Sequence, residues 1–90
     1  MSRYIAAYDV SHPSQRAKVA RVLSEYGRRL QWSVFEVDLE PIELPTLKRS
    51  VGALLAASDR FDLVPIDPDV RRARVTWQQH AVSDRTVLFV

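Results

Sequence analysis

Apolar and polar positions follow a strand pattern at the start of the chain and a helical pattern directly after it. Residues 3–9 are apolar on both faces, which is typical of a central strand, and they end on the carboxylate of Asp9. Residues 14–26 then repeat apolar side chains at helical spacing, namely Val19, Val22, Leu23 and Tyr26. Pro13 is well placed to start this helix, and Gly27 is expected to close it as a left-handed C-cap.

Residues 29–39 alternate between apolar and polar positions, but the alternation changes phase. Leu30, Trp32 and Val34 share one face, whereas Phe35, Val37 and Leu39 share the other. A slip of this kind predicts a bulge, a hairpin or a strand that is buried on both sides. If helices cover one face of the sheet, the other face also needs a cover, and a second copy of the protein is the simplest one.

The second half of the chain predicts one more helix and two more strands. Residues 43–56 predict a helix with Pro45 in its first turn and an apolar stripe at Leu44, Leu47, Val51, Leu54 and Leu55. Residues 61–66 predict a strand near a sheet edge, because Pro65 cannot donate to a ladder. Residues 86–90 predict a short final strand, which would expose apolar edge groups unless it is paired.

The resulting order, β-α-β-β-α-β, predicts an α+β fold of the ferredoxin-like class with an extra C-terminal strand. Residues 1–66 are expected to form the core, and residues 67–90 a C-terminal segment of the same single domain. Ninety residues leave room for one hydrophobic core. Many unrelated activities use this fold, so the fold alone does not define a function.

Composition limits the possible chemistry. The chain has no cysteine, which excludes disulfides and thiolate metal sites. No signal-peptide pattern and no apolar run of about 20 residues is present, so a cytoplasmic protein without a membrane partner is expected. The basic residues are eleven arginines and two lysines, with a net charge of +2. A guanidinium grips phosphate oxygens in a bidentate manner, which favours nucleic acid as a partner, although GC-rich coding also favours arginine.

An ordered set of motifs resembles a known family over residues 3–66. The motifs are Tyr8-Asp9-Val10-Ser11, a helix opened by Arg16 and Lys18, Tyr26-Gly27, the run from Arg29 to Glu36, and Asp62-Leu63-Val64-Pro65-Ile66. Together they are similar to the small, non-integrase CRISPR-associated adaptation protein of the spacer-acquisition complex. Residues 67–90 match this family only loosely.

The resemblance implies a fold, an activity and a set of partners. It implies a ferredoxin-like homodimer whose sheets face one another, with the last strand of each chain adding to the sheet of its partner. It also implies Mg²⁺-dependent endonuclease activity on RNA or DNA, or a scaffolding role beside the CRISPR integrase. Asp9 would be the catalytic and metal-binding residue. Arg16, Lys18, Arg29, Ser33 and Phe35 would contact nucleic acid, although Lys18 stands where an arginine is common and lacks its bidentate fork.

Each candidate residue also has a plainer interpretation. Asp9 could instead cap the first helix or its Pro13 turn, and Phe35 could be an ordinary core residue. His12 could shuttle protons near neutral pH, or it could be an exposed loop residue. Trp32 and Trp77 are expected in the core or in an interface.

Three functions therefore remain open from the sequence. The first is a metal-dependent nuclease, and the second is a non-catalytic dimer that clamps duplex DNA for the integrase. The third is a generic ferredoxin-like RNA-binding or ligand-binding module. An RNA-recognition motif would need exposed aromatic side chains on its sheet, and the sequence has no such signature.

Overall fold

The sheet is organised around β1 (Ser2–Asp9), which has a neighbour on each side. The computed structural model describes residues 1–67, 76–77 and 87–88. After β1 come α1 (Pro13–Ser24), β2 (Gly27–Gln31), β3 (Val34–Leu39), α2 (Glu43–Gly52) and β4 (Arg60–Ile66), followed by the short strands β5 (Thr76–Trp77) and β6 (Val87–Leu88). The order in the sheet is β2-β3-β1-β4. The ferredoxin-like α+β fold expected from the sequence is confirmed.

All three ladders of this sheet are antiparallel. On β1, Ala6 is opposite Phe35 of β3 and Leu63 of β4, and Arg3 is opposite Asp38 and Ile66. Because side chains alternate along a strand, the Ala6 row and the Arg3 row point to opposite faces. The Ala6 row is buried and forms the core face, and the Arg3 row forms the open face.

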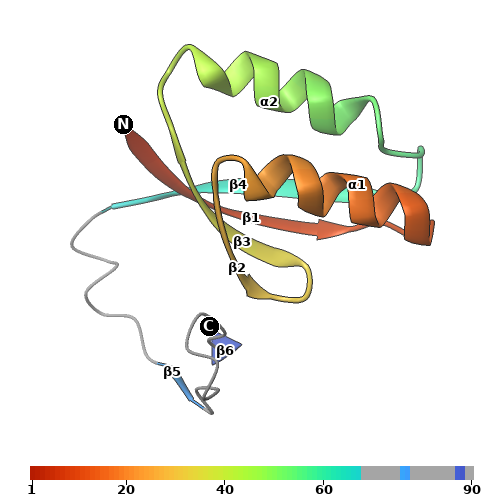
Figure 1. Ribbon diagram of the computed structural model, residues 1–90, viewed down its shortest axis with the longest axis horizontal. Coiled ribbons are helices and arrows are strands. Elements are labelled where there is room, and N and C mark those ends of the chain that lie inside the picture. The colour runs from red at the N-terminus through yellow and green to blue at the C-terminus, as the bar shows by residue number, and fades with distance from the viewer. Residues whose placement is uncertain (68–75, 78–86, 89–90) are drawn as a thin grey trace.

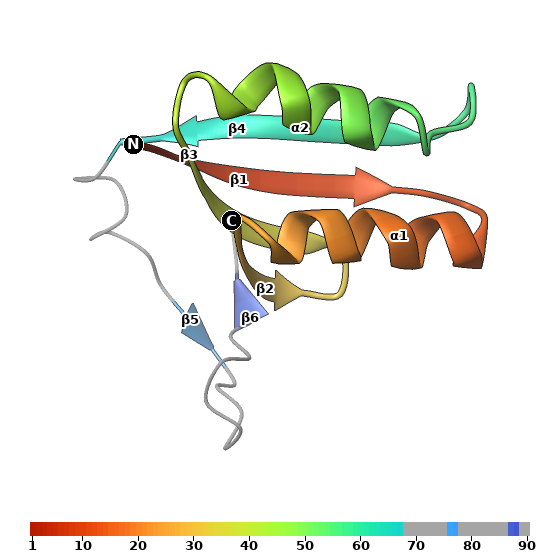
Figure 2. The ribbon, with the colours of Figure 1, turned by 45° about the horizontal axis from the view of Figure 1, so that its top comes forward.

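Both helices cover the core face of the sheet. Figure 1 shows α1 and α2 on one side of the four strands, and Figure 2 shows α2 over β4 and β1. Their buried positions are Val19 and Leu23 in α1 and Leu47 and Val51 in α2, as the apolar spacing predicted. The core comprises Ala6, Tyr8, Val10, Val19, Leu23, Phe35, Val37, Leu39, Leu47 and Val51. No helix covers the open face in the described part of the chain.

A hairpin and a bulge together explain the phase slip in residues 29–39. Strands β2 and β3 are joined by a turn at Trp32 and Ser33, and their register shifts between Arg29 and Gln31. Two of the three expected causes of the slip are therefore present at once. The hairpin returns the apolar residues of β3 to the core face, where Phe35 is 2% exposed.

The predicted role of Gly27 is wrong. Helix α1 ends at Ser24, its C-cap is Glu25 in right-handed geometry, and Gly27 is the first residue of β2. A Cβ at Gly27 would lie 1.9 Å from the backbone oxygen of Glu36. Glycine is therefore needed because β2 approaches β3 closely, and not because a helix ends there.

The remaining boundaries differ modestly from those expected. Helix α2 stops at Gly52, whereas the apolar stripe suggested residue 56, because Leu54 and Leu55 already belong to the following turns. Strand β4 is an edge strand, as Pro65 predicted. Strand β6 pairs with β5 of the same chain. Pairing of the last strand across a dimer stays a prediction. Expectations for residues 68–75, 78–86 and 89–90 lie outside the described part.

Neither described helix combines the length and the apolar character that crossing a membrane would require.

Candidate functional site

Asp9 lies at the C-terminal end of the central strand, on the open face. It is exposed, and its register partner across the β1–β4 ladder is Arg60. Within the described residues, no hydrogen bond or ion pair occupies its carboxylate. Its backbone is nevertheless held by the sheet, since Tyr8 next to it donates its N–H to the carbonyl of Ser33 at 3.1 Å. The structure thus presents an unoccupied carboxylate on a fixed strand end.

Asp9 does not cap the first helix. The N-cap of α1 is His12, and no side chain caps this end by a hydrogen bond. Asp59, from the α2–β4 connection, instead binds the loop that follows Asp9. Its Oδ1 accepts from the N–H and the hydroxyl of Ser11, both at 3.2 Å, and its Oδ2 accepts from the N–H of Ala56 at 2.8 Å. The capping interpretation of Asp9 is therefore wrong.

The environment of Asp59 favours its ionised form. The backbone N–H groups of Ala56 and Ser11 lower the pKa of its carboxyl group below the usual range, and the Ser11 hydroxyl adds to the effect. The partner Ser11 is 48 residues away from Asp59, so no local pattern could have revealed this contact.

One chain offers few ligands for a metal ion. The described residues contain no group of three or more histidine, aspartate or glutamate side chains that could hold an ion. Mg²⁺ is commonly held by one or two carboxylates plus waters and substrate phosphates. The exposed carboxylate of Asp9 fits this pattern as a single ligand.

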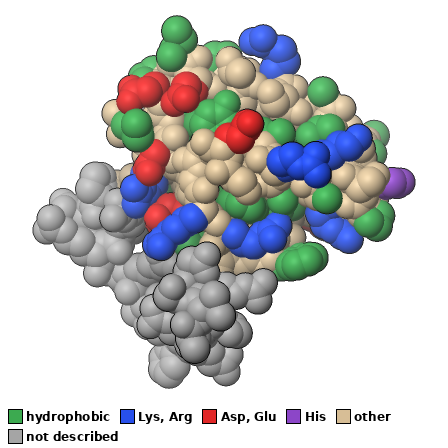
Figure 3. Space-filling view, in the orientation of Figure 1, with side chains coloured by type: hydrophobic (Ala, Val, Ile, Leu, Met, Phe, Trp, Pro, Cys, Tyr) green, Lys and Arg blue, Asp and Glu red, His purple; other side chains and the backbone are tan. Residues whose placement is uncertain are grey.

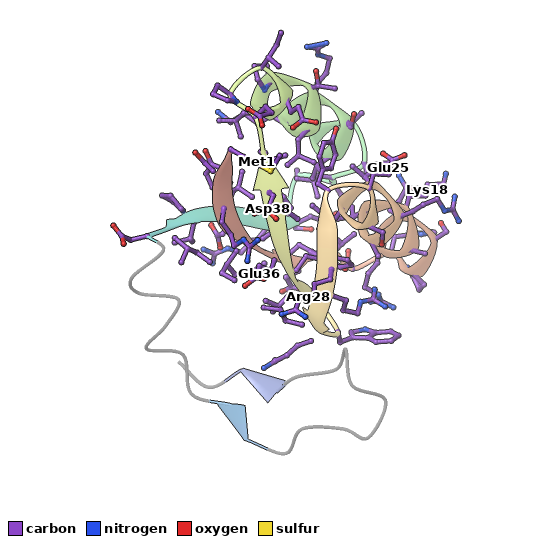
Figure 4. All side chains as sticks on the ribbon, turned by 60° about the vertical axis from the view of Figure 1, so that its left-hand side comes forward. Met1, Lys18, Glu25, Arg28, Glu36 and Asp38 are labelled. Atoms are coloured by element: carbon purple, nitrogen blue, oxygen red, sulfur yellow. The ribbon has the colours of Figure 1, made fainter. Side chains whose placement is uncertain are left out.

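Basic side chains surround the same end of the sheet. Figure 3 shows lysine and arginine side chains gathered over α1 and the β2–β3 hairpin. Arg16, in the first turn of α1, donates from Nη1 to the carbonyl of Val10 at 3.3 Å, which places its guanidinium beside the residue after Asp9. Lys18 is exposed and points away from the sheet (Figure 4). Of these two predicted contacts, Arg16 is held near Asp9, whereas Lys18 is not directed toward it.

Arg29 packs between two aromatic rings. Its guanidinium carbon lies 5.2 Å from the ring centroid of Trp32 and 5.1 Å from that of Phe35. Its Nε is buried and has no hydrogen-bond partner among the residues that the structure describes. Trp32 is 66% exposed, so it is not a core residue, and its expected alternative place in an interface stays a prediction. The turn places this ring outside the sheet, which strand periodicity could not show.

Ser33 and Phe35 have different surroundings. Ser33 is in the turn, where its carbonyl accepts from the N–H of Tyr8. Phe35 is 2% exposed, and its ring stacks against Tyr8 with a centroid distance of 6.3 Å. The core interpretation of Phe35 therefore describes this structure, and its ring is not accessible to a base. His12 is an exposed residue at the start of α1, with Nδ1 2.9 Å from the hydroxyl of Ser14.

The sequence did not reveal an ionic cluster on the open face. Arg3 of β1 contacts Asp38 and Glu36 of β3, and Arg28 of β2 lies 3.7 Å from Glu36. Figure 4 shows Glu36 and Asp38 along β3, with Arg28 on the neighbouring strand. Glu36 is 6% exposed, so two arginines compensate a buried charge.

These features define a class of protein: a ferredoxin-like α+β chain with a free carboxylate at the end of its central strand and arginines around it. A sequence model of the family described as "CRISPR associated protein Cas2" matches residues 1–74. The chain therefore belongs to the CRISPR-associated Cas2 family, as the motifs predicted.

Relatives and solved structures agree with this assignment. A Rhodospirillum rubrum protein named CRISPR-associated endoribonuclease Cas2 4 is 41% identical over 66 residues, which cover 72% of this chain and 53% of that protein. A Nitrosomonas europaea protein named CRISPR-associated endoribonuclease Cas2 2 is 33% identical over 76% of this chain and 61% of its own length. This chain thus spans less than two thirds of either relative. A Thermus thermophilus protein named CRISPR-associated endonuclease Cas2 2 is 38% identical over 70% of this chain and 71% of its own length.

The solved structures show the same fold. A hypothetical protein from Thermus thermophilus, TT1823, has a TM-score of 0.72 at 29% identity and covers 96% of this chain and 98% of its own. Streptococcus pyogenes Cas2 has a TM-score of 0.78 at 24% identity over 84% of this chain and 99% of its own, a similarity that concerns the fold alone.

Proposed function

We propose that this chain is a CRISPR-associated endonuclease that cleaves phosphodiester bonds of RNA or DNA and takes part in spacer acquisition. The observation that carries the proposal is the exposed carboxylate of Asp9 on a rigid strand end, unoccupied within the described residues. The names of the relatives, endoribonuclease and endonuclease, support this class of reaction. The arginines near this end supply the positive charge that a phosphate backbone requires.

The active form would be a homodimer with facing sheets. The open face has no helical cover in the described part of the chain, and it carries a row of apolar side chains: Ile5, Ala7, Val34, Val64 and Ile66. Val64 is 54% exposed, which is costly for a residue that remains in water. A second copy would cover this row and bring a second Asp9 to the same edge.

Asp9 of each protomer would hold a divalent cation, for which Mg²⁺ is the natural candidate. Hard oxygen ligands and spare coordination positions for water and phosphate suit that ion. When bound, it would polarise the phosphate and activate a water molecule. Arg16 would orient the phosphate backbone, since its guanidinium is already anchored to the carbonyl of Val10, the residue after Asp9.

The other predicted contacts take different parts in this proposal. Arg29 and Lys18 would contribute positive charge. Ser33 would position the end of β1 through its carbonyl, and Phe35 would act through packing beneath Arg29.

The substitution Asp9→Asn tests the nuclease directly. It removes the charge and keeps the size, so cleavage of single-stranded RNA and duplex DNA with Mg²⁺ should fall by on the order of 10²-fold or more. The matched control is Asp62→Asn. Asp62 is an exposed carboxylate of β4 on the open face of the sheet, and its replacement should leave the cleavage rate unchanged. Undiminished cleavage by Asp9→Asn, or a rate insensitive to chelator, would contradict the proposal.

A non-catalytic clamp for the integrase is the second candidate. A chain with this fold, 24% identical, is part of a solved structure entitled "Partial Cas6-RT-Cas1--Cas2 complex", with a TM-score of 0.72. If purified protein never cleaves, but binds duplex DNA with an affinity that falls steeply with salt and also binds the integrase, this role replaces the nuclease.

A further inference from the structure

We infer that Trp32 and Arg29 form a stacking site for an unpaired nucleobase, at the tip of the β2–β3 hairpin. This inference rests on the proposed action on nucleic acid, but it requires neither cleavage nor a metal. The site is separate from Asp9, since Arg29 shares the core face with Phe35 whereas Asp9 lies on the open face.

The exposure of Trp32 is the first reason. A tryptophan side chain left 66% exposed gives up most of the free energy that its burial would provide. Packing within the described chain does not account for this placement. Exposed aromatic side chains of this kind are the platforms on which single-stranded nucleic acids stack their bases.

The fixed geometry of the turn is the second reason. The carbonyl of Trp32 accepts from the hydroxyl of Tyr8 at 3.5 Å, and the next carbonyl, that of Ser33, accepts from the N–H of Tyr8 at 3.1 Å. Tyr8 is itself buried against Phe35. The backbone that carries the indole is thus tied to the central strand, so a ligand would not have to order the turn before binding.

The charge at this position is the third reason, and it identifies the ligand. The guanidinium carbon of Arg29 lies 5.2 Å from the indole centroid, and its buried Nε has no acceptor within the described part of the chain. A guanidinium beside an aromatic platform offers a cation to the phosphate next to a stacked base. Arg16, at the same end of the sheet, adds a second guanidinium. A protein partner would not require this concentration of positive charge.

The ligand is single-stranded for a geometric reason. In a duplex, each base is already stacked between its neighbours, and its faces are unavailable to the indole. An unpaired base, at a frayed end or in a single strand, has a free face. The site would therefore prefer single strands, and would show little base preference because every base has such a face.

Fluorescence provides the test, since the chain has two tryptophans. In the full chain carrying Trp77→Phe, Trp32 is the sole indole, and an oligothymidylate or oligouridylate of about ten nucleotides should quench its emission. A blunt duplex of the same length should not. Absence of quenching by either oligonucleotide, or equal quenching by the duplex, would overturn the inference. So would quenching that appears only when the integrase is added, because Trp32 would then be a protein contact.

Affinity measurements on proteins that retain Trp77 provide a test that does not depend on the Trp77→Phe substitution. By fluorescence anisotropy with labelled oligothymidylate, Trp32→Ala should weaken binding by about 5- to 150-fold, and Trp32→Tyr should restore most of it. The control is Ile42→Ala, since Ile42 is 84% exposed at the start of α2, away from the hairpin. An equal loss in Ile42→Ala, or no loss in Trp32→Ala, would also overturn the inference.

Failure of this inference and failure of the proposed nuclease give different results. Asp9→Asn should abolish cleavage and keep the quenching of Trp32. Cleavage without quenching would refute the stacking site alone, and quenching without any cleavage would refute the nuclease alone.

Discussion

Arg3 of β1 holds Asp38 of β3 through two parallel hydrogen bonds, from Nε to Oδ1 at 2.6 Å and from Nη2 to Oδ2 at 2.8 Å. Its Nη1 also donates to Oε1 of Glu36 at 3.1 Å. The hydrogen bond to Asp38 raises the pKa of Arg3 above its usual value. The charges of Glu36 and Asp38 also raise this pKa, whereas desolvation lowers it. One guanidinium thus joins two acids of the adjacent strand on the open face.

Removal of this guanidinium should destabilise the fold. Arg3→Ala removes the 3.1 Å ion pair with Glu36, which is 6% exposed, and we expect the free energy of unfolding to fall by about 1–3 kcal/mol. Arg3→Lys keeps the charge but loses the bidentate fork, so its free energy of unfolding should lie between those of the parent and Arg3→Ala. Urea denaturation measures all three proteins. Arg21→Ala, at an exposed position of α1, is the control, and an equal effect there would contradict the role of Arg3.

The two glycines of the chain should respond in opposite directions to alanine. Gly27→Ala places a Cβ 1.9 Å from the backbone oxygen of Glu36, so β2 must move, at a cost of about 1–3 kcal/mol. Gly52→Ala, at the end of α2, meets nothing within 4 Å and should stabilise the protein by about 0.4–1 kcal/mol. Thermal denaturation followed by circular dichroism compares both variants with the parent. A loss of stability in Gly52→Ala, or no loss of stability in Gly27→Ala, would contradict the different roles given to the two glycines.

The link from Asp59 to Ser11 should weaken in acid. The pKa of Asp59 is lower in the folded chain than in the unfolded chain, because the N–H groups of Ala56 and Ser11 favour the carboxylate. The stabilisation is therefore fully present above the unfolded pKa of about 3.9, and is lost as the pH falls through the folded value. The stability difference between the parent and Asp59→Ala should shrink below about pH 4 in denaturation curves. A stability difference that does not change with pH would contradict this role of Asp59.

Replacement of Phe35 should affect stability more than binding. Phe35→Leu leaves a gap beside Tyr8 in the core, and we expect a loss of about 1–3 kcal/mol in the free energy of unfolding. Because the ring is 2% exposed, the affinity of the folded protein for nucleic acid should stay within a few fold of the parent. Binding measured well below the melting temperature, together with denaturant curves, separates the two effects. A large loss of affinity without loss of stability would indicate that Phe35 contacts nucleic acid directly.

Periodicity in the sequence predicted most of the fold. The apolar residues of β1, the stripes of both helices and the proline in β4 each identified their element correctly. The errors arose where the structure depends on distant residues. Gly27 looked like a helix terminator, but the backbone of Glu36 in the next strand explains it. Trp32 looked like a strand residue because the turn was not placed.

The candidate site was predictable in position and not in detail. Asp9 was identified because a strand of apolar residues ends on a carboxylate. The loop that follows Asp9 is held by Asp59, which binds Ser11 from the distant α2–β4 connection. The pairing of Arg3 with Asp38 likewise follows from the register of β1 and β3, which the alternating pattern does not define for strands that are not consecutive in the sequence.

The central place of β1 also has a consequence for biosynthesis. This strand is translated before its two neighbours in the sheet, β3 and β4. Translation adds about 5–20 residues per second, so the apolar residues of β1 remain without their neighbouring strands for on the order of seconds, until Ile66 has been added. The nascent chain therefore exposes an aggregation-prone segment during that interval, and slow translation of the middle of the message would prolong it.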